Sequence, residues 1–426
     1  MLKLLKQNGE ELLKKFSIAA YPKEIIKIAE GIYHVVGYGH SNSIIIEANN
    51  SVILVDTLDT DVRAEKLKQL ITNITDKSVK TIIYTHGHPD HRGGAAVFSD
   101  TVNEIIEFEP KKPVLGRTNE LKDILNKRAS YQFGYKLLDK EVVTQGIGIR
   151  EGFTVNEGKY TFLPSTTIYK EEKVNINIDG INMELVSAIG ETDDQIFVWL
   201  PDSKVLCCGD NYYSCWPNLY ALRGSQYRDV SAWIDTLDLI LSYPAEYVLP
   251  GHTKPLIGRD MVKEVLTNFR NAIEYVLEET LKGMNKGLTA DELASTIMLP
   301  DNLAGLPYLG EYYGTVAWSV RSIYNGYLGW FDGNPTKLNK LPTKEYSLKM
   351  LKLIGSELKL IKEIKNSLHN GNQQWAIELC DLLIGAEKEI KIAKQLKAEG
   401  LIKLSKLETS ANGRHYYIAC AKELME

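Results

Sequence analysis

Short apolar runs separated by polar turns fill the beginning of the chain, and this alternation predicts a series of β-strands. The runs lie at residues 32–36, 43–47 and 51–57. The polar pair Asn49-Asn50 favours a tight hairpin turn between the last two runs. Between residues 59 and 75, apolar side chains recur instead at helical spacing. We therefore expect a hairpin that leads into a helix.

Further along the chain, strand-like runs return in two groups. The predicted strands lie at residues 81–84, 181–189, 195–200, 204–208 and 246–250. Residues 95–180 are weakly patterned, so we expect loops there that shape a pocket. Helices and strands in this mixed order are typical of a layered α/β domain.

The pattern becomes helical from residue 259 onward. Residues 261–284 carry apolar positions at helical spacing, and the run Thr-Ala-Asp-Glu at residues 289–292 has the form of a capping box that begins another helix. Residues 343–426 contain further helix pairs. We expect an N-terminal helical extension, an α/β domain and a helical domain, at residues 1–20, 21–258 and 259–426.

Composition and charge narrow the classes of protein that fit this pattern. The chain has 426 residues, of which 44% are hydrophobic and 25% are charged, as in ordinary globular proteins. Its net charge of −5 disfavours nucleic acid as a partner, because phosphate binding needs a basic surface. No apolar run approaches the length of a membrane span, and the first residues carry charge too early for a secretory signal.

Five cysteines are scattered along the chain without a Cys-x-x-Cys spacing. The adjacent pair Cys207 and Cys208 falls in a predicted strand, so the two side chains are expected to point to opposite faces. This usage favours reduced, mostly buried thiols, and we expect a cytoplasmic protein.

The densest chemistry in the chain lies directly after the apolar run at residues 81–84. His86, His88, Asp90 and His91 place three imidazoles and one carboxylate within six residues. Neutral imidazoles and carboxylates are ligands of Zn²⁺ and similar ions. His86 and His88 alternate as on an extended backbone, whereas Asp90 and His91 follow the strand end and can face a second ion. We interpret this motif as a metal site rather than as a solvated loop.

Three more candidate ligands follow predicted strands. Glu191, Asp210 and His252 each lie at the C-terminal end of a strand, where active sites of layered α/β folds gather. Any one of them alone is also compatible with a turn or a surface position. Together they can complete a two-metal site.

The motif resembles the His-x-His-x-Asp-His signature of the metallo-β-lactamase superfamily. The order of hairpin, helix and histidine strand is also the order of that family. The resemblance implies an α/β fold of the αββα sandwich type. It also implies that Asp56, at the end of the hairpin, does not bind an ion itself but supports the side chains that do.

One branch of the superfamily, the type III alkylsulfatases, resembles the chain more closely. This branch has glutamate at the position of Glu191, where most of the superfamily has histidine. Residues 218–229 resemble its block Asn-Leu-Tyr-x-Leu-Arg-Gly-x-x-Tyr-Arg-Asp, and residues 312–316 and 327–335 resemble a second block. The resemblance implies a metallo-β-lactamase-like catalytic domain, an all-α dimerisation domain and a homodimer.

The resemblance implies that His86, His88 and Glu191 hold one ion. It implies that Asp90, His91 and His252 hold a second ion, and that Asp210 bridges the two. Two zinc ions are expected, although iron or manganese also suits a carboxylate-rich site. Such a pair can share a water or hydroxide and clamp an oxyanion. Asp90, Asp210 and Tyr313 are the expected catalytic residues.

The expected reaction is hydrolysis of an alkyl sulfate ester to an alcohol and inorganic sulfate by a dinuclear-zinc enzyme. The substrate is then a small anionic ester with an apolar tail. Arg223 can clamp the sulfate and Asn218 can donate from its amide, although a structural salt bridge is an alternative role for Arg223. Tyr212 and Trp216 can wall an apolar pocket, or can belong to the core.

Three departures from the branch keep other functions open. The family has histidines at the positions of Ser214, Pro217 and Trp318. Without such an acid the leaving alcohol needs another donor, for which tyrosines such as Tyr313 are candidates with a high pKa. The same scaffold can alternatively hydrolyse another ester, a thioester or a phosphorus substrate. A non-catalytic metal-binding scaffold is the third hypothesis.

Overall fold

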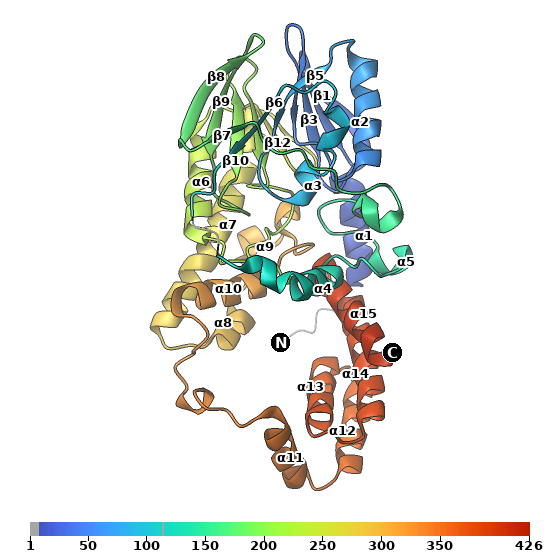
Figure 1. Cartoon of the computed structure of the whole chain (residues 1–426). Helices are drawn as coiled ribbons and strands as arrows, with labels where there is room; N and C mark the ends of the chain where they lie inside the picture. Colours follow the sequence, from blue (N-terminus) through green and yellow to red (C-terminus); the bar gives the residue numbers. More distant parts are fainter. Residues whose placement is uncertain (1–7, 113–114) are drawn as a thin grey trace.

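The computed structural model describes residues 8–112 and 115–426, and its strands, which lie between residues 24 and 257, form two β-sheets packed face to face (Figure 1). Helices cover the outer faces of the sheets, and a helical region follows. The expected αββα sandwich followed by an all-helical part is confirmed. Residues 1–7 of the expected N-terminal extension lie outside the described residues, and helix α1 (Gly9–Ala20) follows them.

In the described part of the chain, the first sheet has seven strands that follow one another in chain order. They are β1 (Glu24–Ala29), β2 (Ile32–Val36), β3 (Ser43–Glu47), β4 (Val52–Val55), β5 (Val79–Ile83), β6 (Glu104–Phe108) and β7 (Thr167–Tyr169). Strands β1 to β4 pair antiparallel, whereas β4 to β7 pair parallel. The expected hairpin turn at Asn49-Asn50 joins β3 to β4.

The second sheet, counted over the same described ranges, has six strands in the order β13-β12-β11-β10-β9-β8. They are β8 (Lys173–Ile178), β9 (Ile181–Ser187), β10 (Ile196–Leu200), β11 (Val205–Gly209), β12 (Tyr247–Pro250) and β13 (Leu256–Ile257). Strands β11 and β12 are parallel, and the other neighbours are antiparallel. The predicted strands are present, while β6, β7 and β8 lie in the weakly patterned stretch.

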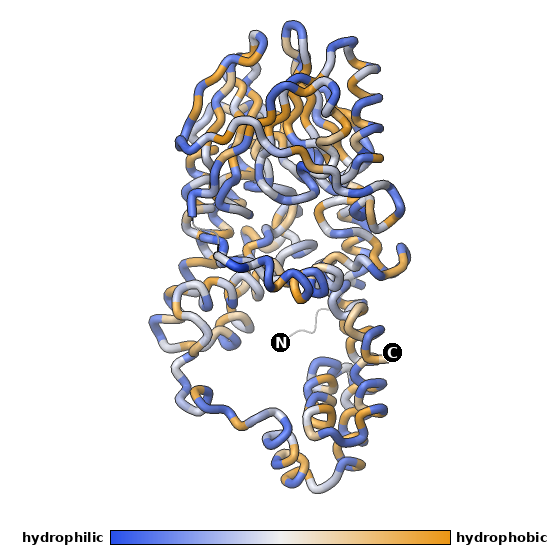
Figure 2. Tube along the Cα trace, viewed as in Figure 1, coloured by the Kyte–Doolittle hydropathy of each residue, from blue (hydrophilic) through white to orange (hydrophobic). Residues whose placement is uncertain are grey.

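The two sheets share an apolar interior. Because alternate residues of a strand face opposite sides, Ile44 and Ile46 pack between the sheets while Ile45 packs on the outer side. Cys207 likewise faces the interior between the sheets and Cys208 the opposite side, which confirms the expectation for this pair. Figure 2 shows hydrophobic positions concentrated along the strands of both sheets.

Helices cover the outer face of each sheet. Helix α2 (Asp61–Ile74) packs Leu67 and Ile71 against the first sheet, at the place where helical spacing predicted a helix. Helices α6 (Val230–Ser242) and α7 (Arg259–Asn285) pack against the second sheet, with Trp233 and Phe269 fully buried. Shorter helices lie in the connections between strands: α3 (Pro89–Arg92), α4 (Lys122–Gln132) and α5 (Asp139–Val142).

The helical region is divided between two sets of hydrophobic contacts. Helices α8 (Ala290–Thr296), α9 (Asp301–Ala304) and α10 (Val316–Leu328) join α6 and α7 in one cluster with the second sheet. The remaining helices form separate clusters: α11 (Thr343–Ile354), α12 (Glu357–His369), α13 (Gln373–Gly385), α14 (Ile390–Leu407) and α15 (Ala411–Met425). Figure 1 shows α11 to α13 apart from the sandwich. Packing therefore changes between α10 and α11, whereas the expected boundary at residues 258–259 lies inside one core.

The last helix returns to the sandwich and packs against α4. Ser410, which caps α15, donates from Oγ to the carbonyl of Tyr313 at 2.6 Å. Arg414 of α15 pairs with Glu10 of α1 at 2.7 Å. The end of the chain thus helps to position a residue that is expected in the active site.

None of the helices in the part of the chain that the structure describes could span a membrane.

Candidate metal centre

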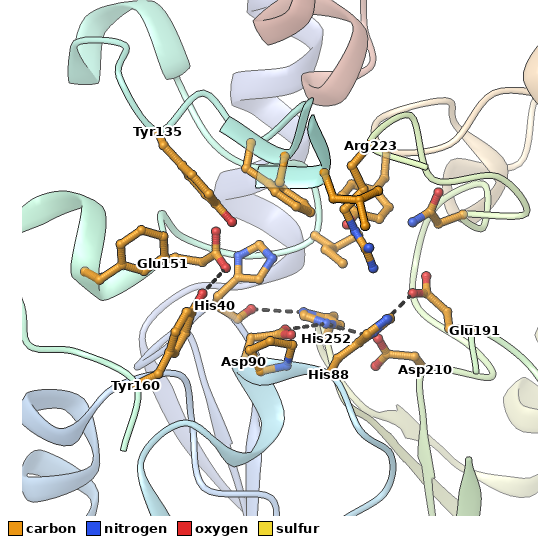
Figure 3. Close-up of a pocket in the computed structure, with 18 of the residues that line it drawn as sticks. His40, His88, Asp90, Tyr135, Glu151, Tyr160, Glu191, Asp210, Arg223 and His252 are labelled. Atoms are coloured by element: carbon orange, nitrogen blue, oxygen red, sulfur yellow. Dashed lines mark hydrogen bonds and ion pairs between the residues drawn. The ribbon is translucent and has the colours of Figure 1, made fainter. Parts of the chain in front are cut away.

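The expected metal ligands converge at the carboxyl ends of strands from both sheets (Figure 3). The histidine motif follows β5, where the chain leaves the sheet and α3 begins at Pro89. The other three ligands follow β9, β11 and β12: Glu191, Asp210 and His252. Because these strand ends meet where the two sheets pack together, side chains that are distant in the sequence face one another.

Four side chains form a closed cage, which consists of Asp90, His91, Asp210 and His252. Asp90 Oδ2 lies 3.4 Å from both His91 Nε2 and His252 Nε2. Asp210 Oδ2 lies 3.5 Å and 3.3 Å from the same two nitrogens. A tetrahedral ion with ligands at about 2.1 Å has edges of about 3.4 Å between its ligand atoms. Within the described residues, His91 Nε2 and Asp210 Oδ1 are buried without a hydrogen-bond partner, so the cage fits an ion.

A second group of ligands is more open. His86 Nε2 lies 2.9 Å from His88 Nδ1 and 3.8 Å from Asp210 Oδ2. His88 Nδ1 lies 3.6 Å from Glu191 Oε2. Ligand atoms of His88, Glu191 and Asp210 all lie within 4.8 Å of one another. Asp210 therefore lies between the two groups, where a bridging carboxylate is expected.

Glu191 is held by two further side chains. Arg228 Nη1 lies 3.0 Å from Glu191 Oε2, and Tyr213 Oη donates to Oε1 at 2.8 Å. Tyr213 Oη in turn accepts from the backbone N–H of Asn218 at 2.8 Å. An ion that takes Glu191 as a ligand must therefore share this carboxylate with Arg228.

Hydrogen bonds behind the ligands fix their orientation. His91 Nδ1 donates to Asp56 Oδ2 at 2.7 Å. Asp56 also accepts from the backbone N–H and the hydroxyl of Thr85, at 2.9 Å and 2.7 Å. His252 Nδ1 donates to the carbonyl of His40 at 2.9 Å. Metal-binding histidines usually donate their second N–H in this way, so the geometry suits the supporting role expected for Asp56.

Burial and neighbouring charges set the protonation of the cluster. Burial lowers the pKa of His86 to about 3 and holds the pKa of His88 well below its usual range, so both imidazoles are neutral. Burial opposes ionisation of Asp210, but His252 and His91 outweigh it and hold the pKa of that carboxyl well below its ordinary value. Burial opposes protonation of His91 and His252, but Asp210 outweighs it and raises the pKa of both imidazoles. Divalent ions bind neutral imidazoles, so an ion that binds at these two side chains displaces their protons.

A cavity of about 490 Å³ opens onto both groups of ligands. Asn218 and Arg223, expected to bind substrate, line it together with Tyr313. In the described residues no carboxylate forms an ion pair with Arg223, which donates to the carbonyl of Gly224 at 3.4 Å. One part of the wall is apolar and consists of Leu125, Ala129, Phe133, Ile147 and Phe153. The cavity thus combines a cationic position with an apolar wall beside the metal ligands.

Tyr212 and Trp216 do not line the cavity, and their expected role as pocket walls is wrong. Both are buried in the core that the second sheet shares with the helices. Tyr212 packs edge-to-face on Phe269 with ring centroids 5.1 Å apart, and Trp216 Nε1 donates to Ser319 Oγ at 3.0 Å. The loop after β11 turns these two side chains away from the ligands, so closeness to Asp210 in the sequence does not bring them to the site.

The positions at which alkylsulfatases have histidine also lie outside the cavity wall. Ser214 does not line the cavity, and its backbone N–H donates to Thr253 Oγ1 at 3.1 Å. Trp318 lines a different cavity beside Tyr227, and Pro217 lines neither.

Several residues of the cavity were missed in the sequence. They are His40, Tyr135, Glu151, Tyr160 and Arg228. His40 Nδ1 donates to the carbonyl of Ile149 at 2.8 Å, and a ligand atom of His40 lies within 4.8 Å of those of Asp90 and His252. A lone histidine after a glycine in the loop between two predicted strands was the only available signal for His40. Tyr135, Glu151 and Tyr160 lie in the weakly patterned stretch, and Arg228 lies in the matched block at residues 218–229, where it was given no role.

Two family models match the chain. The model of the metallo-beta-lactamase superfamily matches residues 36–252, and the model of alkyl sulfatase dimerisation matches residues 289–426. The first match contains all seven expected metal ligands. The second begins at the N-cap of α8 and runs through α15.

Curated relatives cover most of the chain. It is 35% identical over 388 residues to a linear primary-alkylsulfatase of a Pseudomonas species, a match that covers 89% of this chain and 73% of that protein. It is 30% identical over 414 residues to an alkyl/aryl-sulfatase of Saccharomyces cerevisiae, which covers 94% of this chain and 64% of that protein. This chain is thus shorter than the relatives that it resembles.

A solved structure has the same fold over nearly the whole chain. The stereoselective inverting sec-alkylsulfatase Pisa1 of a Pseudomonas species superimposes with a TM-score of 0.84 at 25% identity, covering 94% of this chain and 65% of that chain. The two family models, the relatives and the ligand geometry agree with one another. The chain belongs to the metallo-β-lactamase superfamily, and within it to the alkylsulfatases that carry the dimerisation domain.

Proposed function

We propose that this protein is a dinuclear-zinc hydrolase that cleaves alkyl sulfate esters to an alcohol and inorganic sulfate. The observation that carries the proposal is the position of Arg223, which lines the same cavity as both groups of metal ligands. The relatives named as alkylsulfatases support the same substrate class. The cage of Asp90, His91, Asp210 and His252 has carboxylate-to-imidazole distances of 3.3 to 3.5 Å, which are compatible with a tetrahedral zinc ion, and iron and manganese are the alternatives.

The residues of the cavity suit the two ends of such a substrate. The Arg223 guanidinium can hold two sulfate oxygens through parallel hydrogen bonds. With its amide oriented to suit both neighbours, Asn218 donates to the carbonyl of Tyr220 at 2.7 Å and accepts from Arg228 Nη1 at 3.3 Å. One amide hydrogen of Asn218 is then left for the sulfate. The apolar wall excludes water from the tail.

When bound, the two ions supply positive charge and an activated water. Asp90 lies on the cavity wall, and although burial opposes its ionisation, His91 and other neighbouring histidines lower its pKa. Its ionised carboxylate can accept a hydrogen bond from water and orient it. Burial, together with Glu191 and Asp90, raises the pKa of Tyr313 well above its ordinary value. Tyr313 therefore acts as a neutral hydrogen-bond donor that positions the substrate, and does not release a proton at neutral pH.

Release of inorganic sulfate tests the proposal. Metal-replete protein is incubated with dodecyl sulfate and with a short secondary alkyl sulfate, with and without added zinc, and we expect zinc-dependent release. Turnover of a carboxylate ester, thioester or phosphate ester without sulfate release would contradict the sulfatase proposal and would indicate a different hydrolase on the same scaffold. If the protein contains its full complement of metal and hydrolyses no ester, the result would instead support a non-catalytic metal-binding scaffold.

We also propose that the protein is a homodimer. The region that matches the dimerisation model exposes large apolar side chains, including Trp330 (73% exposed), Leu353 (81%) and Leu358 (78%). Burial of such side chains against a second copy stabilises association. Light scattering at micromolar concentration should give twice the chain mass of 48.0 kDa. A monomeric mass would contradict this proposal.

A cytoplasmic location is proposed from the thiols. All five cysteines are free, and four of them are buried. Unpaired thiols are typical of a reducing compartment. Recovery of the protein from the culture medium rather than from the cytoplasmic fraction of the cell would contradict it.

A further inference from the structure

One wall of the cavity holds a buried carboxyl group that the reaction does not use. Glu151 is 5% exposed and lines the cavity. Tyr160 Oη donates to Glu151 Oε1 at 2.6 Å, and Gln145 Nε2 lies 3.4 Å from Oε2. Figure 3 shows Glu151 and Tyr160 on one side of the cavity and Arg223 on the other, with Asp90 and the metal-binding histidines between them.

Four aromatic side chains form a chain of ring contacts on this wall of the cavity. Phe133 stacks on Tyr135 with centroids 5.6 Å apart, and Tyr135 meets Phe153 edge-to-face at 4.8 Å. Phe153 in turn lies 5.0 Å from Tyr160. All four rings line the cavity. The faces of aromatic rings attract cations, and several rings together are a common way to bind ammonium groups.

The carboxyl group of Glu151 has no cationic partner. In residues 8–112 and 115–426, no lysine or arginine forms an ion pair with it, and its neighbour Arg150 pairs with Asp139 at 2.5 Å. The groups that contact the carboxyl are donors, so its free side presents an acceptor to the cavity. Burial without a counter-charge raises the pKa of Glu151 to about 8. A cation that enters the cavity would supply the missing charge.

We propose that Glu151 and these four rings form a subsite for a cationic group, and that the preferred substrates are sulfate esters whose alkyl tail carries an amine or quaternary ammonium group. This inference rests on the proposed sulfatase function and names its substrate class. The sulfate then lies at Arg223, and the ammonium group lies at Glu151 on the opposite wall. A zwitterionic ester places a charged group at both walls of the cavity, whereas a plain alkyl sulfate leaves Glu151 without a cationic partner.

Hydrolysis of matched esters tests the preference. The substrates are trimethylammonioalkyl sulfates of increasing chain length, each compared with the neutral alkyl sulfate and the hydroxyalkyl sulfate of the same length. At the best length, kcat/KM for the ammonium ester should exceed that for the neutral ester about 10-fold or more. In Glu151→Gln this ratio should fall about 10-fold, while Glu172→Gln, on an exposed residue, keeps it. If Glu151→Gln does not fold, Phe153→Leu removes one ring and gives the same readout.

Binding separates this inference from the sulfatase proposal. Calorimetry with an alkyltrimethylammonium ion, which contains no ester, should show binding that weakens about 10-fold in Glu151→Gln. If no sulfate ester is hydrolysed, the sulfatase proposal fails and this measurement still decides the ammonium subsite. Equal efficiency on ammonium and neutral esters, or a preference for the hydroxyalkyl ester, would overturn the inference, because Glu151 would then keep its proton when the ester binds and would act only through hydrogen bonds.

Discussion

His91 Nδ1 donates to Asp56 Oδ2 at 2.7 Å, and both side chains are buried behind the cavity. The carboxylate holds the imidazole so that Nε2 faces the other ligands of the cage. Asp56 has a positive φ of 59°, a conformation that asparagine also tolerates. The substitution Asp56→Asn therefore removes the charge without straining the backbone.

We expect Asp56→Asn to weaken metal binding about 10- to 100-fold, because the support of a metal-binding histidine is lost. Competition with a chromogenic chelator measures the affinity directly. Asp179→Asn is the matched control, since Asp179 also has a positive φ but lies in a half-buried turn that contacts Asn50 and Ser51 and no metal ligand. Equal affinities of Asp56→Asn and the unchanged protein would contradict a supporting role.

The two groups of metal ligands are expected to differ in affinity. The cage around His91 already has edges of 3.3 to 3.5 Å, whereas Glu191 of the other group is shared with Arg228. Titration of metal-free protein with Co²⁺, followed by absorption, should show a tight and a weaker step. His252→Ala should abolish the tight step and Glu191→Gln the weaker one. A single step with two equivalents of equal affinity would refute this order.

Arg223→Ala should lower kcat/KM for dodecyl sulfate by about 10- to 100-fold, mainly through KM, because a charged hydrogen-bond donor to the sulfate is lost. Steady-state sulfate release measures the effect. The control is Arg321→Ala, which breaks an exposed ion pair with Asp291. A loss of thermal stability with no change in KM would instead support a structural role for Arg223.

Glu151 should make stability depend on pH. Burial raises the pKa of Glu151 from its ordinary 4.5 to about 8. Between these two values the folded protein keeps a proton that the unfolded chain has lost, so the free energy of unfolding falls as the pH rises through this window. Glu151→Gln has no such proton, and its Tm should fall less over the same range. Parallel Tm profiles for the two proteins would show that the Glu151 carboxyl is ionised in the fold.

The strands of the sandwich were largely predictable because their interior residues are apolar on both sides. Strands β3 and β4 are almost entirely buried, and such runs stand out in a sequence. Strands β7 and β8 lie at sheet edges, and their residues alternate between exposed and half-buried positions. Strand β7 has only three residues, which is too short to give a clear pattern. Strand β8 does alternate polar and apolar residues, which is the pattern of a half-buried strand, and the sequence prediction missed it.

The sequence by itself was enough to predict the candidate metal ligands, because four of them follow one strand at a spacing that lets their side chains face shared ions, and the other three follow the ends of further strands. Only the tertiary structure decided the cavity wall. Glu151 and Tyr160 come from the connection between α5 and β7, and His40 comes from the loop between β2 and β3, so they meet only once the chain has folded. Tyr212 and Trp216, although close to Asp210 in the sequence, turn into the core. The direction in which a loop side chain points depends on the elements packed around it, and the chain around that residue does not encode it.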